Sequence, residues 1–210
     1  MSLGMKRWEQ PDKGVLFIVT GASGTGKTTL VKEALEVIPG LEFSVSYTTR
    51  QQRFGEIDGT DYHFIDQQTF DLHVQQNAFL EHATVYGNSY GTLRSAVENS
   101  LKDGKSILLE IDHQGAQQVR LLLPESISLF VLPPSLEAVE QRLRGRQTDS
   151  ESVIQKRMSK IQEQLRHCGS FDFLIVNDDL NSAHDQFQSI LVSALLHSAR
   201  RQSWVEKYRM

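Results

Sequence analysis

The chain has 210 residues, 39% of them hydrophobic and 23% charged, with a formal net charge of −4. That length suits one compact domain, and the negative charge argues against a nucleic-acid partner, since such partners require basic surface. The single cysteine, Cys168, excludes an internal disulfide and fits a cytoplasmic location, and no apolar run has the roughly 20 residues that a membrane span needs. Residues 1–4 look like a cloning remnant and are left out of the fold.

The strongest local signal is VLFIVTGASGTGKTTL at residues 15–30. Its first six residues predict a strand buried on both faces, and the spacing after Lys27 predicts a helix. Between them lies the complete pattern GxxxxGK(S/T), which cradles phosphates with backbone N–H groups, a lysine and a Mg²⁺-binding hydroxyl. The sequence therefore predicts a nucleoside triphosphate site at Gly21, Ala22, Ser23, Gly24, Thr25, Gly26, Lys27, Thr28 and Thr29.

The next segment, after a stop at Pro39-Gly40, predicts a small lobe inserted into the core. Strands are expected at residues 43–50, 62–65 and 78–86, with a helix at 66–76, a loop at 51–61 and a turn at 87–92. Arg50 and Arg53 stand at the entry of the loop. Surface arginines are usually solvated, but a phosphoryl-transfer motif implies an anionic second substrate that such a pair could bind.

The remaining chain alternates helices with apolar strands. Strands are expected at 106–111, 127–132 and 171–176, and helices at 95–104, 135–144, 148–167 and 180–203. Glu110 and Asp112 stand at the carboxyl end of one strand, where P-loop proteins hold Mg²⁺, although Asp112 could equally cap the next helix. The pattern predicts an α/β fold with a parallel P-loop sheet covered by helices on both faces.

Several motifs resemble the guanylate kinase family in order and spacing: SVSYTTR, GEIDGTDYHF, FLEHATVYGNSYGT, LLEIDHQGAQQVR, FVLPPSLE, RLRGRQTDSE and LIVNDDL. The resemblance covers residues 14–200. It implies a nucleoside monophosphate kinase with a P-loop core (5–43 and 95–210), a GMP-binding lobe of small α+β structure (44–94) and a helical lid (about 142–160). It also implies transfer of the γ-phosphoryl group of MgATP to GMP, giving ADP and GDP.

The resemblance also implies roles for individual residues. The GMP phosphate would be held by Arg50, Arg53, Tyr62 and Tyr90, and the guanine by Ser46, Glu81 and Thr92. Glu110 and Asp112 would serve both GMP and, together with Thr28, the Mg²⁺ ion. The adenine would lie near Asn177, and the lid arginines would be Arg142, Arg146 and Arg157, with Arg146 also touching ATP. The catalytic groups would be Lys27, Arg50, Asp112 and those lid arginines.

Other functions remain open on the residues alone. Related scaffolding domains bind phosphorylated peptides but lose the P-loop lysine or glycines, and here Lys27 and Thr28 are present. A GTPase would need NKxD after a late strand, whereas this chain has Asn177-Asp178-Asp179. A kinase for another monophosphate is the nearest rival. The chain departs from the family at Gln51, Gln52, Phe54 and Gln147, which bears on rates rather than on the reaction, and it leaves open a monomer or a homodimer.

Overall fold

The computed structural model describes residues 11–145 and 151–209. Its centre is a five-stranded sheet in which every neighbouring pair of strands is parallel, in the order β2-β7-β1-β8-β9. The strands are β1 (Leu16–Thr20), β2 (Leu41–Phe43), β7 (Ser106–Glu110), β8 (Ile127–Leu132) and β9 (Phe173–Val176). The expected parallel sheet is confirmed, and β1 is buried along its whole length at the middle of it.

Alternate residues of β1 point into two separate cores. Phe17 and Val19 pack with helices α1 (Lys27–Val37) and α7 (Leu180–Leu195) on one face. Leu16 and Ile18 pack with α3 (Arg94–Lys102) and α4 (His113–Leu122) on the other face. Because successive side chains of a strand face opposite ways, this two-sided burial is what an uninterrupted apolar run requires.

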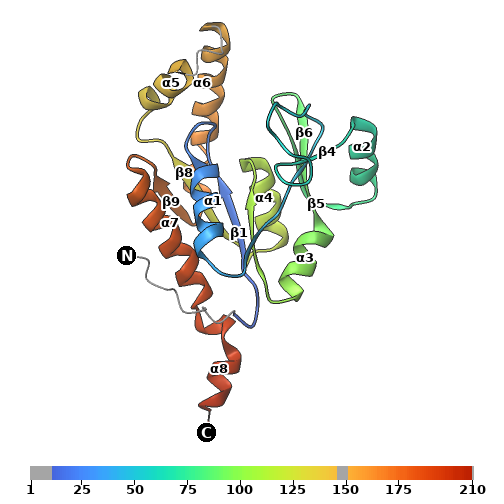
Figure 1. The fold of residues 1–210 in the computed structure, drawn as a ribbon, viewed down its shortest axis with the longest axis vertical. Coiled ribbons are helices and arrows are strands. Elements are labelled where there is room, and N and C mark those ends of the chain that lie inside the picture. The colour runs from blue at the N-terminus through green and yellow to red at the C-terminus, as the bar shows by residue number, and fades with distance from the viewer. Residues whose placement is uncertain (1–10, 146–150, 210) are drawn as a thin grey trace.

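A second, four-stranded sheet stands beside the first, in the order β4-β3-β6-β5 (Figure 1). Its elements are β3 (Tyr47–Thr48), β4 (His63–Phe64), helix α2 (Gln67–Gln75), β5 (Phe79–Val85) and β6 (Asn88–Leu93). This sheet is formed by the part of the chain between β2 and α3. The start of α2 follows the sequence closely, because the Asp66 side chain caps it by accepting from Thr69 N at 2.7 Å.

Two expectations for this region are wrong. Residues 88–93 form a strand rather than part of a turn, and the reversal is confined to Tyr86 and Gly87, with φ of 51° and 81°. Positive φ at both central residues is the geometry of a two-residue hairpin, and it lets the polar residues that follow pair at once with β5. Residues 43–50 also fail to form one strand, because Phe43 ends β2 in the first sheet and Tyr47 begins β3 in the second.

The C-terminal segment is not the single long helix expected over 180–203. Helix α7 ends at Leu195, and a 3-10 turn (Ser198–Arg200) leads to α8 (Gln202–Lys207), which projects from the body in Figure 1. Asp12 holds the break, because its N–H donates to Arg200 O at 2.8 Å and its carboxylate accepts from Ser203 N and Oγ at 2.7 and 2.6 Å. These contacts lower the pKa of Asp12, chiefly through the Ser203 hydrogen bonds.

Helices α5 (Leu136–Gly145) and α6 (Glu151–Leu165) rise beside the P-loop (Figure 1). Val139 of α5 and Ile161 of α6 form a buried cluster with Ala22 of the loop. Strand β9 lies at the sheet edge, and there only Ile175 is buried, whereas Phe173, Leu174 and Val176 are exposed. The side chains of this last predicted strand are therefore mostly exposed, unlike those of the interior strands.

Candidate active site

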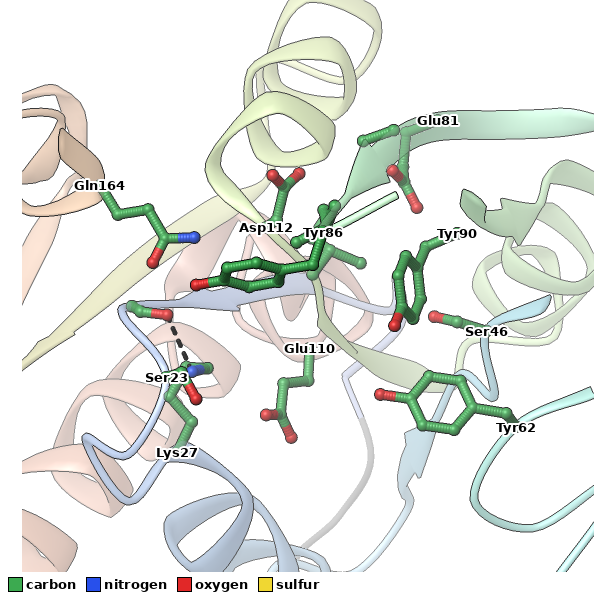
Figure 2. A pocket seen from close by; sticks show the side chains of 14 residues that line it. Ser23, Lys27, Ser46, Tyr62, Glu81, Tyr86, Tyr90, Glu110, Asp112 and Gln164 are labelled. Carbon is green, nitrogen blue, oxygen red and sulfur yellow. Dashed lines mark hydrogen bonds between the residues drawn. The ribbon is translucent and has the colours of Figure 1, made fainter. Parts of the chain in front are cut away.

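One cleft of about 240 Å³ lies between the P-loop, the second sheet and helix α6. The predicted site residues that line it are Gly21, Ser23, Lys27, Ser46, Tyr62, Glu81, Tyr90, Glu110 and Asp112. Figure 2 shows these side chains around a common space, with Lys27 near the P-loop and Glu81 on the second sheet. Residues far apart in the sequence thus meet where the parallel strands end, as ligand sites in such sheets do.

The P-loop takes its shape from its glycines and from a support beneath it. Gly26 precedes α1 with φ of 89°, and a Cβ there would stand 2.3 Å from Nδ2 of Asn177. The same amide nitrogen donates to Thr25 O at 2.7 Å, and Asn177 is buried. Asn177 therefore contacts the backbone of the P-loop. Its predicted contact with adenine stays a prediction.

Lys27 folds over the loop that precedes it. Its Nζ donates to Gly21 O at 2.8 Å and to Ala22 O at 3.0 Å, and Figure 2 shows the side chain turned toward the loop. Burial lowers the pKa of Lys27, and the Glu110 carboxylate opposes that shift. The ammonium therefore sits at the loop whose backbone N–H groups form an anion site.

Thr28 and Glu110 are in direct contact beside the loop. The Thr28 hydroxyl donates to both Glu110 carboxylate oxygens, at 2.9 and 3.1 Å. Asp112 also lines the cleft but caps α4, accepting from Gly115 N at 3.0 Å and from Gln114 Nε2 at 3.2 Å. The two interpretations that the sequence left open, a site residue and a helix cap, are therefore compatible for Asp112. Within the described ranges, no group of three His, Cys, Asp or Glu side chains is arranged to hold a metal by itself.

Arg50 lies in a partly buried cluster beside the cleft. Its Nη2 pairs with Oε1 of Glu56 at 2.7 Å, and its guanidinium lies 5.3 Å from the centre of the Tyr62 ring. Burial acts to lower the pKa of Arg50, but Glu56 and Tyr90 outweigh it and the net shift is upward. The same contact lowers the pKa of Glu56. Arg53 is exposed nearby, with its backbone N–H donating to Glu56 Oε2 at 2.8 Å.

Two tyrosines complete this side of the cleft. The rings of Tyr62 and Tyr90 meet edge to face, with centroids 5.9 Å apart. Burial raises the pKa of Tyr62 to about 12, reinforced by the negative charge of Glu110. The Tyr62 phenol therefore remains protonated at neutral pH and can donate a hydrogen bond to an anion beside Arg50.

Glu81 is a buried carboxylate that opens on the same cleft. It is 2% exposed, and its Oε1 accepts from Thr92 Oγ1 at 2.6 Å across the β5–β6 pair. Glu81, Ala83 and Val85 alternate along β5 and all line the cleft, and a register shift with β6 lies between Phe79 and Glu81. Burial raises the pKa of Glu81 to about 7; Thr92 opposes this shift, and the charge of Asp112 adds to it.

Three arginines are expected on the helical side of the cleft. Arg157 of α6 is half-buried, and its charge opposes the burial that raises the pKa of Tyr86. Arg142 belongs to α5, and Arg146 lies outside the described residues, as do Gln147 and the expected capping residues 148–150. The roles of these arginines stay predictions.

Three polar side chains in or beside the cleft were not singled out from the sequence. Glu56 looked like one more polar loop residue, although an acid six positions after Arg50 could have marked its partner. Tyr86 and Gln164 line the cleft from the hairpin turn and from α6, and Lys160 Nζ lies 4.3 Å from the centre of the Tyr86 ring. The second sheet and α6 thus already touch across the cleft mouth, a contact that no local pattern indicates.

Known proteins are similar to this chain along most of its length. A sequence model of the guanylate kinase family matches residues 13–194. Guanylate kinase of Alcanivorax borkumensis is 48% identical over 190 residues, covering 90% of this chain and 92% of that relative. Guanylate kinase of Neisseria gonorrhoeae is 46% identical over 193 residues, covering 92% of this chain and 94% of the relative.

A solved structure agrees with the fold. The crystal structure of guanylate kinase from Anaplasma phagocytophilum superposes with a TM-score of 0.77 at 31% identity, covering 91% of each chain. Among the described helices, none is long and apolar enough to cross a membrane.

Proposed function

The chain belongs to the guanylate kinase family, and we propose that its cleft transfers the γ-phosphoryl group of ATP to GMP, giving ADP and GDP. One observation supports this most directly. The P-loop lysine, Lys27, and the buried carboxylate of Glu81 open on the same cleft, so a triphosphate at one end faces a base-reading group at the other. Tyr62, Tyr90 and Glu110 line the same cleft, so an acceptor phosphate would lie among them.

The donor side would bind ATP through the loop backbone and Lys27. Backbone N–H groups at the start of α1 point toward the phosphates, and Lys27 neutralises charge that spreads over the transferred group. Because phosphoryl transfer needs chiefly alignment and charge stabilisation, these groups suffice without a nucleophile from the protein.

The acceptor side would hold the GMP phosphate with Arg50, Arg53, Tyr62 and Tyr90. A phosphate monoester has a second pKa of about 6, so its attacking oxygen is already ionised at neutral pH. No general base is needed for that reason. The pair between Arg50 and Glu56 would have to open or be shared as the phosphate arrives, so we expect Glu56 to hold the guanidinium in place until then.

Guanine would be read by Glu81, with Ser46, Thr92 and Asp112 around it. Guanine presents two donors, N1–H and the 2-amino group, to one side, and an ionised carboxylate can accept both. Adenine lacks that amino group and presents an acceptor at N1, so it would leave a buried carboxylate unpaired. Sites built to hydrogen-bond a substrate group can reject analogues that lack it by about 10⁴–10⁵.

Mg²⁺ is a cofactor that the donor set suits. Thr28 and Glu110 supply a hydroxyl and a carboxylate in contact with each other beside the P-loop. Mg²⁺ is commonly held by one or two carboxylates together with substrate phosphates and water, so these two residues would hold the ion and Asp112 would support it from α4. When bound, the ion supplies neutralisation of phosphate charge. A cytoplasmic location is part of the same proposal, supported by the nucleotide substrates.

Turnover with GMP, AMP, UMP and CMP, measured side by side in a coupled assay with MgATP, tests the acceptor. We expect GMP to dominate by at least a thousandfold in kcat/KM. Glu81→Gln should lower kcat/KM for GMP at least tenfold and change AMP activity less, whereas Glu36→Gln, on an exposed carboxylate of α1, should change neither. An unchanged GMP/AMP ratio in Glu81→Gln would remove Glu81 from guanine recognition.

A further inference from the structure

Helix α4 contacts strand β5 immediately beside Glu81. The side-chain amide of Gln118 pairs with both backbone polar groups of His82, the next residue along β5. Its Nε2 donates to His82 O at 2.8 Å, and its Oε1 accepts from His82 N at 3.2 Å. A side chain of the first sheet's helix layer therefore takes the place that a neighbouring strand would occupy on β5.

The same helix also touches the Glu81 carboxylate itself. A Cβ built on Gly115 would stand 2.2 Å from Oε2 of Glu81 and 2.9 Å from its Cδ. The carboxylate has little room to swing aside, because Glu81 is 2% exposed and its other oxygen is held by Thr92. The carboxylate thus lies directly against the backbone of α4, one turn from Asp112.

We propose that Gly115 and Gln118 are positioning residues for guanine recognition. Gln118 fixes the backbone of β5 beside Glu81, and Gly115 leaves the space that the Glu81 carboxylate fills. This inference rests on the proposed role of Glu81 as the group that reads guanine. Two guanine donors can be accepted together only if both carboxylate oxygens are held at defined places, and a misplacement of about 1 Å can cost two powers of ten.

Stability alone does not account for this arrangement. Helix α4 is anchored to the core by Ala116 and Val119, which are fully buried in the cluster with Leu16 and Ile18. Gln118 is only half-buried, and hydrogen bonds of that kind contribute only about 1 kcal/mol each to folding. Glycine in a helix is unfavourable by about 1 kcal/mol relative to alanine, so Gly115 weakens α4 rather than strengthening it.

The first test compares Gln118→Met with Gln117→Met, a change at an exposed neighbour on α4. Methionine keeps the length of the side chain but removes both hydrogen bonds to His82. We expect the KM for GMP to rise five- to tenfold in Gln118→Met with the KM for ATP unchanged, and neither to change in Gln117→Met. Gln118→Glu, which would place a carboxylate oxygen against His82 O, should raise the KM for GMP at least as much as Gln118→Met.

The second test adds a methyl group at Gly115. Gly115→Ala should raise the KM for GMP at least tenfold. The substitution does not weaken the helix itself, because alanine favours helix more than glycine does. Gly169→Ala is its control, because nothing lies within 4 Å of the Cβ that would be added there. Equal kinetics in Gly115→Ala and Gly169→Ala would overturn the role of Gly115.

A double-mutant comparison separates this inference from the proposed function. If Gln118 acts through Glu81, Gln118→Met should change the KM for GMP less than twofold when Glu81→Gln is already present. Should Gln118→Met have the same effect in both backgrounds, or none in either, the positioning role is overturned while Glu81 keeps its own. If Glu81→Gln leaves the GMP/AMP ratio unchanged, the guanine-reading role of Glu81 fails first, and the positioning role with it.

Discussion

The P-loop takes most of its geometry from one continuous stretch of chain, with a single distant contact from Asn177, whereas the surroundings of Glu81 are assembled from three separate elements. Lys27 donates to carbonyls five and six residues before it. Glu81, in contrast, is held by Thr92 on the next strand and lies against Gly115 on a helix of the other layer. Apart from Asn177, which donates to Thr25 O, the first site depends on residues of its own loop, whereas the second can be damaged from places that never touch substrate.

The largest effect that this comparison predicts is at Lys27. Lys27→Met should lower kcat by about 10³ or more, because charge developing on the transferred group loses its stabilising ammonium. The affinity for GMP, measured by titration calorimetry, should stay within a few-fold of wild type. Substantial residual turnover in purified Lys27→Met would contradict the donor-site assignment.

On the acceptor side, Arg50→Ala should lower kcat/KM for GMP by about 10². Hydrogen bonds to charged groups contribute about 1.5–3 kcal/mol each, so losing the contact with phosphate accounts for this factor, and Glu56 would also be left without its partner. Both the KM for GMP and kcat should change, since Arg50 would position the phosphate and screen its charge. Steady-state kinetics with each substrate varied would decide, and an effect confined to ATP would exclude Arg50 from the acceptor site.

A milder disturbance is the protonation of Glu81. With a pKa of about 7, the carboxylate that accepts from guanine is lost as the pH falls, so the KM for GMP should rise about tenfold between pH 8 and pH 6. Ionisation of the GMP phosphate contributes near pH 6, so Glu81→Gln, measured over the same range, isolates the part due to Glu81. A KM profile that is the same in both proteins would show that Glu81 does not titrate at the site.

The free energy of unfolding of the substrate-free protein should rise as the pH falls, whereas the affinity for GMP should fall. Because the pKa of Glu81 is raised from its ordinary 4.5, the folded state holds this proton more tightly than the unfolded state does. The resulting stabilisation is fully present below pH 4.5 and is lost as the pH rises through about 7. Denaturant midpoints at pH 6 and 8, compared between wild type and Glu81→Gln, report this single contribution.

The smallest expected effect is at the mouth of the cleft. An exposed cation–π contact contributes about 0.5–1 kcal/mol, so Lys160→Ala should change the KM for GMP less than fivefold and the free energy of unfolding by less than 1 kcal/mol. Kinetics and denaturant unfolding of this variant would measure both. A tenfold or larger change in KM would mean that contact between α6 and Tyr86 governs access to the acceptor side.

The difference between the two sides also explains what could be predicted from the sequence. The sequence predicts the P-loop because its strand, glycines, lysine and helix follow one another without interruption. For Arg50 the residues indicate only that the pair with Arg53 could bind an anionic substrate, and the family resemblance assigns the acceptor phosphate to it. The role of Glu81 rests on that resemblance alone. The sequence does not indicate the contacts of Gln118 and Gly115 with β5, because they exist only once α4 is docked. Gln118 and His82, for example, are 36 residues apart.

Errors in the predicted elements have similar physical causes. Strand β6 was missed because Asn88, Ser89 and Tyr90 are polar, and because a tyrosine at positive φ is an uncommon first residue of a tight turn. The break after α7 was missed because it depends on Asp12, which lies at the other end of the chain. Interior strands with unbroken apolar runs were located correctly, since burial on both faces leaves few alternatives.

The position of β1 at the centre of its sheet has a consequence for how the chain is made. Leu16 pairs with Ile107 and Phe17 with Ile127, so both partners of β1 are synthesised long after it. The hairpin of β5 and β6 pairs neighbours in the sequence, and hairpins of that kind form within microseconds. On a ribosome that adds about 5–20 residues per second, the base-reading hairpin can therefore form seconds before the phosphate-binding loop is locked between its two strands. During that interval β1 is an unpaired apolar segment of the nascent chain, and such segments need protection from aggregation.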